Sequence, residues 1–174
     1  MPYQEIYSCG AVTYCRPSGH CSTGPTGPTG PAAPSVFGGL YNAASTTLPI
    51  PATTQTILSN LDSAMPSDGV QPNLGTASLT IERSGTYLIN FAVSYLYSNN
   101  AFVEIFVTAN GTRIPGTVAS RDAQTAERVK NVAQSALARL TAGTVLQLAA
   151  YASTGGNLWL QNDGTVLNAV RVGD

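Results

Sequence analysis

The chain has 174 residues, of which 43% are hydrophobic and only 10% are charged, and its formal net charge is −1. A typical protein has about 25% charged residues, and nucleic-acid binding needs clustered basic side chains, so we expect no nucleic-acid partner. No run of residues approaches the ~18 consecutive apolar positions of a membrane-spanning helix, so we expect no membrane partner.

Residues 1–23 form an apolar, aromatic segment that is too short to build a core of its own. We expect it to dock on another surface, and the spacer that follows it favours a surface on another copy of the chain. A connector at one end of a subunit and a receptive surface at the other make a head-to-tail contact, which does not close and therefore generates filaments. Aromatic side chains are favoured interface anchors, so the predicted anchors of this connector are Tyr3, Ile6, Tyr7, Val12 and Tyr14.

The connector also contains all three cysteines, Cys9, Cys15 and Cys21. An odd number of cysteines favours disulfides between chains, which makes each of them a candidate for such a bond. The alternative is that they stay reduced and behave as small buried hydrophobes. A zinc site at Cys15, His20 and Cys21 would lack the close cysteine pairing of structural zinc sites, so we predict no metal and no cofactor.

Residues 24–35 form a spacer that begins with three triplets, Gly-Pro-Thr, Gly-Pro-Thr and Gly-Pro-Ala. Glycine at every third position, here Gly24, Gly27 and Gly30, is the requirement of a collagen triple helix. Three triplets span only about 28 Å at ~3.1 Å per residue, too short to hold three chains together unaided. The triplets are therefore collagen-like only if their neighbour is already a trimer. Otherwise they form a semi-extended linker within one chain.

Residues 36–174 are predicted to form an all-β domain of short strands separated by turns. The strongest signal is the period-two pattern of residues 86–97, whose aromatic and aliphatic residues from Tyr87 to Tyr97 share one face. We expect this face to form the core together with Leu146, Leu148, Leu158 and Leu160. The predicted strands are 36–41, 46–50, 54–58, 76–82, 86–97, 101–109, 112–119, 144–151, 158–161 and 165–172.

Three further signals are local. Asn110-Gly111 favours a type I′ hairpin turn, although Asn110-Gly111-Thr112 is also a glycosylation sequon. Asp163-Gly164 predicts a turn. Residues 126–140 place apolar side chains at helical spacing among good helix formers, so taken locally they predict a helix.

Nothing in the sequence favours an enzyme. The sole histidine, His20, lies in the connector, and neither a nucleophile elbow nor a phosphate-binding loop is present. Asp62 and Asp68 are close in sequence, but a turn explains Asp68 better than a calcium site, which needs more oxygen ligands. Trp159 could stack on a sugar, although a single tryptophan in a strand more often lies in the core or at a subunit interface.

The collagen-like run and the β domain together resemble collagen-stalked trimers with a C1q/TNF-like jelly-roll head. Residues 85–91, Gly-Thr-Tyr-Leu-Ile-Asn-Phe, look like the Gly-x-Tyr-x-x-x-Phe strand of that superfamily. Residues 140–148, Leu-Thr-Ala-Gly-Thr-Val-Leu-Gln-Leu, look like its leucine, small-Gly turn and following strand. The subgroup that the chain resembles is the C-terminal domain of BclA-like exosporium glycoproteins, where Gly-Pro-Thr triplets also precede the head.

The resemblance implies a homotrimeric jelly roll, a strand rather than a helix at 126–140, and a collagen-like role for the triplets. The stalk is much shorter than in BclA-like proteins, and the cysteine-rich start differs from theirs. We therefore predict a structural subunit of a spore-surface fibre or endospore appendage that polymerises head-to-tail through residues 1–23. The alternative is a trimeric exosporium head that binds a ligand or surface without polymerising.

The predicted partners are other copies of the chain, with further exosporium proteins as anchor or tip. The N-terminus lacks the basic and apolar regions of a secretory signal. We therefore expect the protein to reach the spore surface, outside the cell, when its mother cell lyses.

Overall fold

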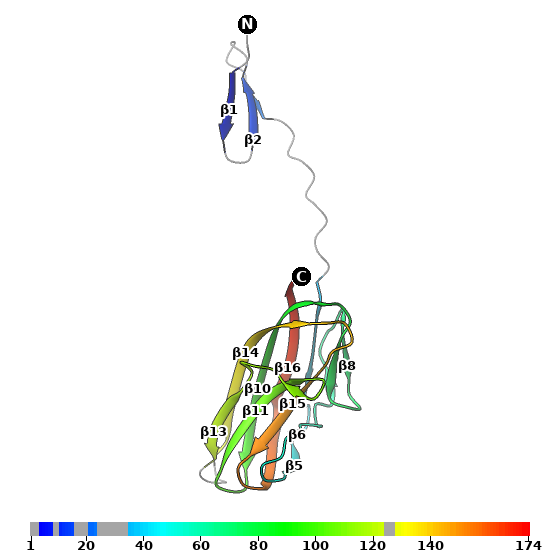
Figure 1. The fold of residues 1–174 in the computed structure, drawn as a ribbon, viewed down its shortest axis with the longest axis vertical. Coiled ribbons are helices and arrows are strands. Elements are labelled where there is room, and N and C mark those ends of the chain that lie inside the picture. Colours follow the sequence, from blue (N-terminus) through cyan, green and yellow to red (C-terminus); the bar gives the residue numbers. More distant parts are fainter. Residues whose placement is uncertain (1–3, 9–10, 16–20, 24–34, 124–127) are drawn as a thin grey trace. The chain divides into compact units, whose positions relative to one another are not determined.

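The structure is a computed structural model that describes residues 4–8, 11–15, 21–23, 35–123 and 128–174 (Figure 1). It divides into two compact units, Met1–Pro34 and Ser35–Asp174. The described residues form strands, turns and bends, and none of them belongs to a helix that could span a membrane. Tyr3, Cys9, Gly24, Gly27 and Gly30 lie outside the described residues, so the predictions made for them stay predictions.

The first unit contains a small antiparallel sheet in the order β1-β2-β3. Its strands are β1 (Gln4–Ser8), β2 (Ala11–Cys15) and β3 (Cys21–Thr23). Tyr7 pairs with Val12, and Cys15 pairs with Cys21. The strands of the predicted connector are therefore paired with one another within the same chain.

The second unit is a sandwich of two antiparallel sheets. The sheet built on β10, called here the β10 sheet, has the order β14-β10-β16-β4-β7, and β5 also pairs with β16. Its two longest strands, β10 and β16, run side by side through the domain (Figure 1). Its strands are β4 (Phe37–Tyr41), β5 (Thr46–Ile50), β7 (Ser63–Ala64), β10 (Gly85–Tyr97), β14 (Lys130–Leu140) and β16 (Gly156–Gly173).

The other sheet, called here the β11 sheet, has the order β12-β11-β15-β9-β8. Strand β13 pairs with β11 at one edge, and β6 pairs with β15. Its strands are β6 (Thr56–Ile57), β8 (Val70–Asn73), β9 (Ser78–Ile81), β11 (Ala101–Ala109), β12 (Thr112–Arg113), β13 (Ala119–Ala123) and β15 (Val145–Ala152).

The core lies between the two sheets and has the composition that the period-two pattern predicts. Every second residue of β10 is buried. The predicted leucines are also buried, both those of β16 in the same sheet and those of β15 in the β11 sheet. This confirms the predicted core, which consists of Tyr87, Ile89, Phe91, Val93, Tyr95, Tyr97, Leu146, Leu148, Leu158 and Leu160.

Residues 130–140 form a strand and not the helix that their local pattern predicts. Strand β14 pairs with β10 along its whole length, from Lys130 opposite Tyr95 to Leu140 opposite Gly85. Eleven residues of long-range pairing outweigh weak helix propensities. The strand implied by the family resemblance is correct.

Two turn predictions have different outcomes. Asn110 and Gly111 have φ values of 50° and 81° and join β11 to β12, as a type I′ turn requires. Asp163-Gly164 is not a turn but an irregularity inside β16, where Asp163 has φ of 53° and the pairing with β10 shifts between Val93 and Tyr95. The predicted strand 112–119 is interrupted between β12 and β13 by a turn at Gly116, with φ of 80°.

The hydroxyl of Tyr95 is buried in the core without a hydrogen-bond partner among the described residues. Burial raises the pKa of Tyr95 from 10.0 to about 12, although Arg121 opposes the shift. The unfolded chain therefore loses this proton first as the pH rises. The contribution of Tyr95 to folding stability is present below pH 10 and is lost as the pH rises towards 12.

We expect Tyr95→Phe to stabilise the fold by about 1 kcal/mol, because it removes an unpaired buried hydroxyl. We also expect the variant to lose less stability in alkali, as measured by urea unfolding at pH 8 and pH 11. The matched control is Tyr97→Phe, because the Tyr97 hydroxyl donates to the Thr154 carbonyl at 2.7 Å and its loss should destabilise. Equal effects of the two substitutions would contradict the prediction.

Candidate self-association face

The β10 sheet has a second, outward face that is also largely apolar. On β10 the residues between the core positions point away from the core and are half-buried, and they include Leu88 and Leu96. Strands β14 and β16 add large exposed apolar side chains to this face, namely Leu137 (64% exposed), Val170 (40%) and Trp159 (37%). A strand with apolar residues on both faces is typical of a sheet that is covered on both sides.

The pairing register arranges this outer face in rows that cross the strands β4, β16, β10 and β14. In each row, directly paired residues point to the same side of the sheet. The first apolar row consists of Phe37, Val170, Leu88 and Leu137. The next row, called here the Asn row, consists of Gly39, Asn168, Asn90 and Ser135. The second apolar row consists of Tyr41, Val166, Ala92 and Ala133.

The Asn row is organised by an amide pair at its centre. Asn90 Nδ2 donates a hydrogen bond to Asn168 Oδ1 at 3.0 Å, and both side chains are half-buried. Next to them, a Cβ at Gly39 would lie 3.1 Å from Asn168 Cβ and 2.8 Å from Met65 Sδ. A Cβ at this position would therefore force Met65 and Asn168 to shift where β4 passes the pair.

At the far end of the face, Trp159 lies beside a surface hollow of about 490 Å³. The hollow is lined by Ser45, Leu96, Trp159, Leu160 and Gln161. Trp159 pairs with Leu96 on β10 and points away from the core. Of the three places predicted for Trp159, the structure excludes the core. A subunit interface and a site where the ring stacks on a sugar are the two that remain.

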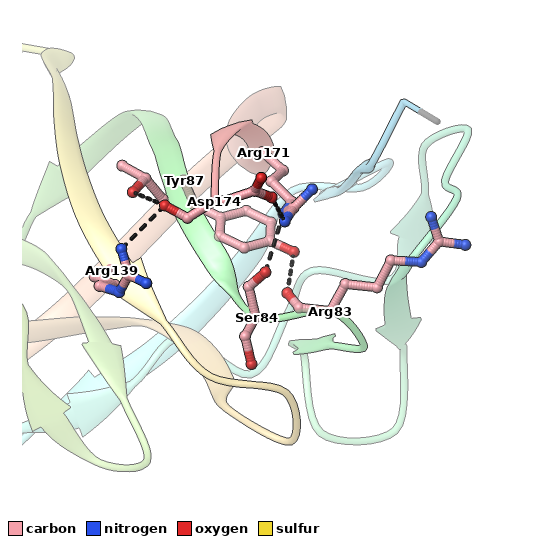
Figure 2. Close-up of polar contacts among 7 residues, drawn as sticks. Arg83, Ser84, Tyr87, Arg139, Arg171 and Asp174 are labelled. Carbon is pink, nitrogen blue, oxygen red and sulfur yellow. Dashed lines mark hydrogen bonds and ion pairs between the residues drawn. The ribbon is translucent and has the colours of Figure 1, made fainter. Parts of the chain in front are cut away.

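A polar cluster closes the other end of the β10 sheet (Figure 2). Arg171 Nε donates to the Ser84 carbonyl at 3.0 Å, and its guanidinium pairs with the Asp174 carboxylate. Arg139 Nη1 donates to the Asp174 backbone carbonyl at 3.0 Å. These contacts connect the C-terminal ends of β16 and β14 next to the first apolar row. We infer that their role is to stabilise this end of the sheet.

Tyr87 belongs to the same cluster, where its hydroxyl donates to the Arg83 carbonyl at 2.6 Å (Figure 2). Burial raises the pKa of Tyr87, although the charges of Arg171 and Arg83 oppose the shift. The phenol therefore stays neutral and holds the start of β10 in place.

The two aspartates considered as calcium ligands have backbone roles. Asp62 Oδ1 accepts a hydrogen bond from the Ala43 amide at 2.8 Å, and Asp68 forms a β-bridge to Phe37. Within the described residues, no three His, Cys, Asp or Glu side chains are close enough to hold a metal ion. What the outer face offers chemically is apolar surface interrupted by the amide pair of the Asn row and, further along β10, by Ser94, whose hydroxyl donates to Asn131 Oδ1 at 2.6 Å.

The structure has close neighbours among solved proteins. Eiger TNF from S. frugiperda matches with a TM-score of 0.58 and 13% identity, over 82% of this chain and 95% of that chain. Murine APRIL at pH 5.0 matches with a TM-score of 0.54 and 13% identity, over 80% of this chain and 100% of that chain. The fold is a TNF-like jelly roll.

The jelly roll predicted from residues 85–91 and 140–148 is thus confirmed. No protein-family model matches the chain. A search of curated proteins gives no significant match either. At 13–14% identity the structural likeness concerns the fold alone.

The predicted connector residues lie outside the jelly roll. Ile6 and Tyr7 are in β1, and Val12 and Tyr14 are in β2. Cys15 and Cys21 face each other across β2 and β3 in the pairing register. Sequence reasoning did not find the outer face, and the signal that could have revealed it is the presence of Leu88 and Leu96 between the core positions of β10.

Proposed function

We propose that the chain is a structural subunit of a bacterial spore-surface fibre or appendage. Its jelly rolls associate in threes through the outer face of the β10 sheet, and the trimers join head-to-tail through residues 1–23. The observation that carries this proposal is the outer face itself, with exposed Leu137, Val170 and Trp159 on β14 and β16, the two strands that flank β10. Burying such apolar side chains against another copy is favourable.

The spacer argues for three copies. If the triplets are collagen-like, glycine at every third position requires three chains to meet at one axis. The triplets end at residue 32, five positions before β4 begins at Phe37. Strand β4 contributes Phe37 and Tyr41 to the outer face, so the first strand after the triplets takes part in the proposed trimer interface.

The connector argues for polymerisation. Residues 1–23 combine five apolar or aromatic anchors with strands that need a partner to bury them. A contact between this connector and a different surface of the next trimer repeats without closing. The spore location rests on the resemblance to BclA-like heads and on Cys9, Cys15 and Cys21, which could form disulfides where no glutathione pool reduces them.

Negative-stain electron microscopy tests the fibre. We expect the full chain to form thin fibres of evenly spaced beads and a truncated chain that begins at Ser22 to form single particles. The truncation keeps the triplets and the jelly roll, so it removes only the connector. The truncated particles are expected to have the mass of three truncated chains, each lighter than the 18.0 kDa full chain.

Other results would point elsewhere. Dispersed trimers from both chains would contradict polymerisation and favour the ligand-binding head, for which the hollow beside Trp159 is the first candidate site. Monomers from the truncated chain would contradict the trimer. Fibres that survive in reductant would show that apolar contacts hold the connector without disulfides.

A further inference from the structure

The amide pair of the Asn row is only partly satisfied within one chain. An asparagine side chain has two N–H donors and an oxygen acceptor. The one bond between Asn90 and Asn168 leaves Asn90 Oδ1 and Asn168 Nδ2 without a partner among the residues that the structure describes. If both side-chain amides are rotated so that oxygen and nitrogen change places, Asn168 donates to Asn90 instead. One oxygen acceptor and the remaining N–H donors are then still free.

These free groups lie in an apolar setting. The first and second apolar rows flank the Asn row on both sides. At its two ends stand the small residues Gly39 and Ser135, so the amides are the largest side chains of the row. When a second copy covers the face, the free donor and acceptor lose water and must find partners or carry a desolvation penalty.

We propose that the Asn row sets the register in which copies of the chain associate, an inference that rests on the proposed self-association. The free Nδ2 of Asn168 in one copy donates to the free Oδ1 of Asn90 in the next. In three copies the contacts run round a closed ring of alternating Asn90 and Asn168 side chains. The apolar rows favour association but do not fix how the copies are aligned, because hydrophobic attraction is non-directional. The donors and acceptors of the amide ring are all hydrogen-bonded in only one alignment of the copies.

The first test replaces the donor of Asn168 by a titratable group. In Asn168→Asp the carboxylate still accepts the bond from Asn90 Nδ2 within its own chain. It cannot donate to the next copy, and it brings a charge into the covered face. At low pH the protonated acid regains an O–H donor, so association should return.

The direction of this pH dependence is fixed. Association favours the protonated acid and therefore raises its pKa, so association is full at low pH and is lost as the pH rises through the pKa of the assembled form. A rise of two units corresponds to a loss of about 100-fold in the association constant per copy. Sedimentation velocity on the full chain measures the fraction that sediments as the 18.0 kDa monomer at pH 4 and pH 8.

The matched control is Asn73→Asp on β8 of the β11 sheet. Asn73 Oδ1 accepts a hydrogen bond from the Thr76 amide at 3.3 Å, which a carboxylate also does. This control adds the same charge away from the proposed interface, and its assembly should match that of the unmodified chain at both pH values. Unchanged assembly of Asn168→Asp at pH 8 would overturn the proposal.

A second variant tests register without introducing charge. In Asn90→Leu with Asn168→Leu the amide pair between the two apolar rows is replaced by apolar side chains, so copies should still associate but in more than one arrangement, seen as several species in native mass spectrometry. A single species with unchanged melting temperature would refute the role of the Asn row. If the unmodified chain itself is monomeric, the proposed self-association fails instead.

Discussion

Leu88→Asp is expected to convert the assembled protein into a folded monomer. Leu88 lies at the centre of the first apolar row, paired with Val170 on one side and Leu137 on the other. Its neighbours Tyr87 and Ile89 point into the core, so the substitution leaves the core intact. Each copy would lose the further burial of a leucine that is already half-buried in the single chain, worth less than the about 1.5–3 kcal/mol of fully burying an exposed one, and would have to desolvate a carboxylate without a partner.

Sedimentation velocity and far-UV circular dichroism together check this expectation, because they separate loss of assembly from loss of fold. The matched control is Leu74→Asp, which makes the same change at a leucine that follows β8 in the other sheet and is 47% exposed. We expect the control to assemble normally. A Leu88→Asp variant that assembles like the unmodified chain would show that the outer face is not the interface.

The core could be predicted from sequence because its signal is local. On β10 large apolar residues occupy every second position from Tyr87 to Tyr97, with Asn90, Ala92 and Ser94 among the residues between them, and a strand is the only regular structure with that period. The Asn110-Gly111 turn is equally local, since the dipeptide itself favours the φ values that the turn requires. Both features depend on residues adjacent in the chain.

The outer face could not be predicted because its rows join residues that are distant in the chain. The first apolar row brings Phe37, Leu88, Leu137 and Val170 together only after β4, β10, β14 and β16 have paired in one register. A shift of one residue in any pairing would send the side chains to the opposite face. No short stretch of sequence encodes that register.

The same reason explains the two misleading local signals. Residues 130–140 have helix-forming side chains, but β10 offers a pairing edge along their whole length. Asp163-Gly164 has turn chemistry, but β10 continues past it, with Val93 paired to Thr165 and Tyr95 paired to Leu160. The chain therefore uses the positive φ of Asp163 for an irregularity within a strand and does not reverse direction.

Phe91→Ala is expected to destabilise the fold strongly and to prevent assembly. Phe91 is 3% exposed and sits at the middle of β10, paired with Gln134 on β14 and Leu167 on β16. Removing a buried phenyl ring typically costs about 3–5 kcal/mol, a large share of the ~5–15 kcal/mol that stabilises a typical domain. Thermal unfolding and sedimentation velocity measure the two consequences.

The matched control for this variant is Phe102→Ala, because Phe102 is 41% exposed on β11. Its backbone amide donates to Ser153 Oγ at 2.9 Å, a bond that the substitution keeps. The control should cost less than about 1 kcal/mol. A soluble, fully assembled Phe91→Ala protein with an unchanged melting temperature would contradict the placement of β10 in the core.

Phe91 and Leu88 then distinguish the two faces of one strand. Phe91 points into the sandwich and Leu88 points out of it, three positions away on β10. If the outer face is the interface, Phe91→Ala should lose fold and assembly together, whereas Leu88→Asp should lose assembly alone. Loss of fold in both variants would mean that the outer face stabilises the single jelly roll, and assembly would then have to use another surface.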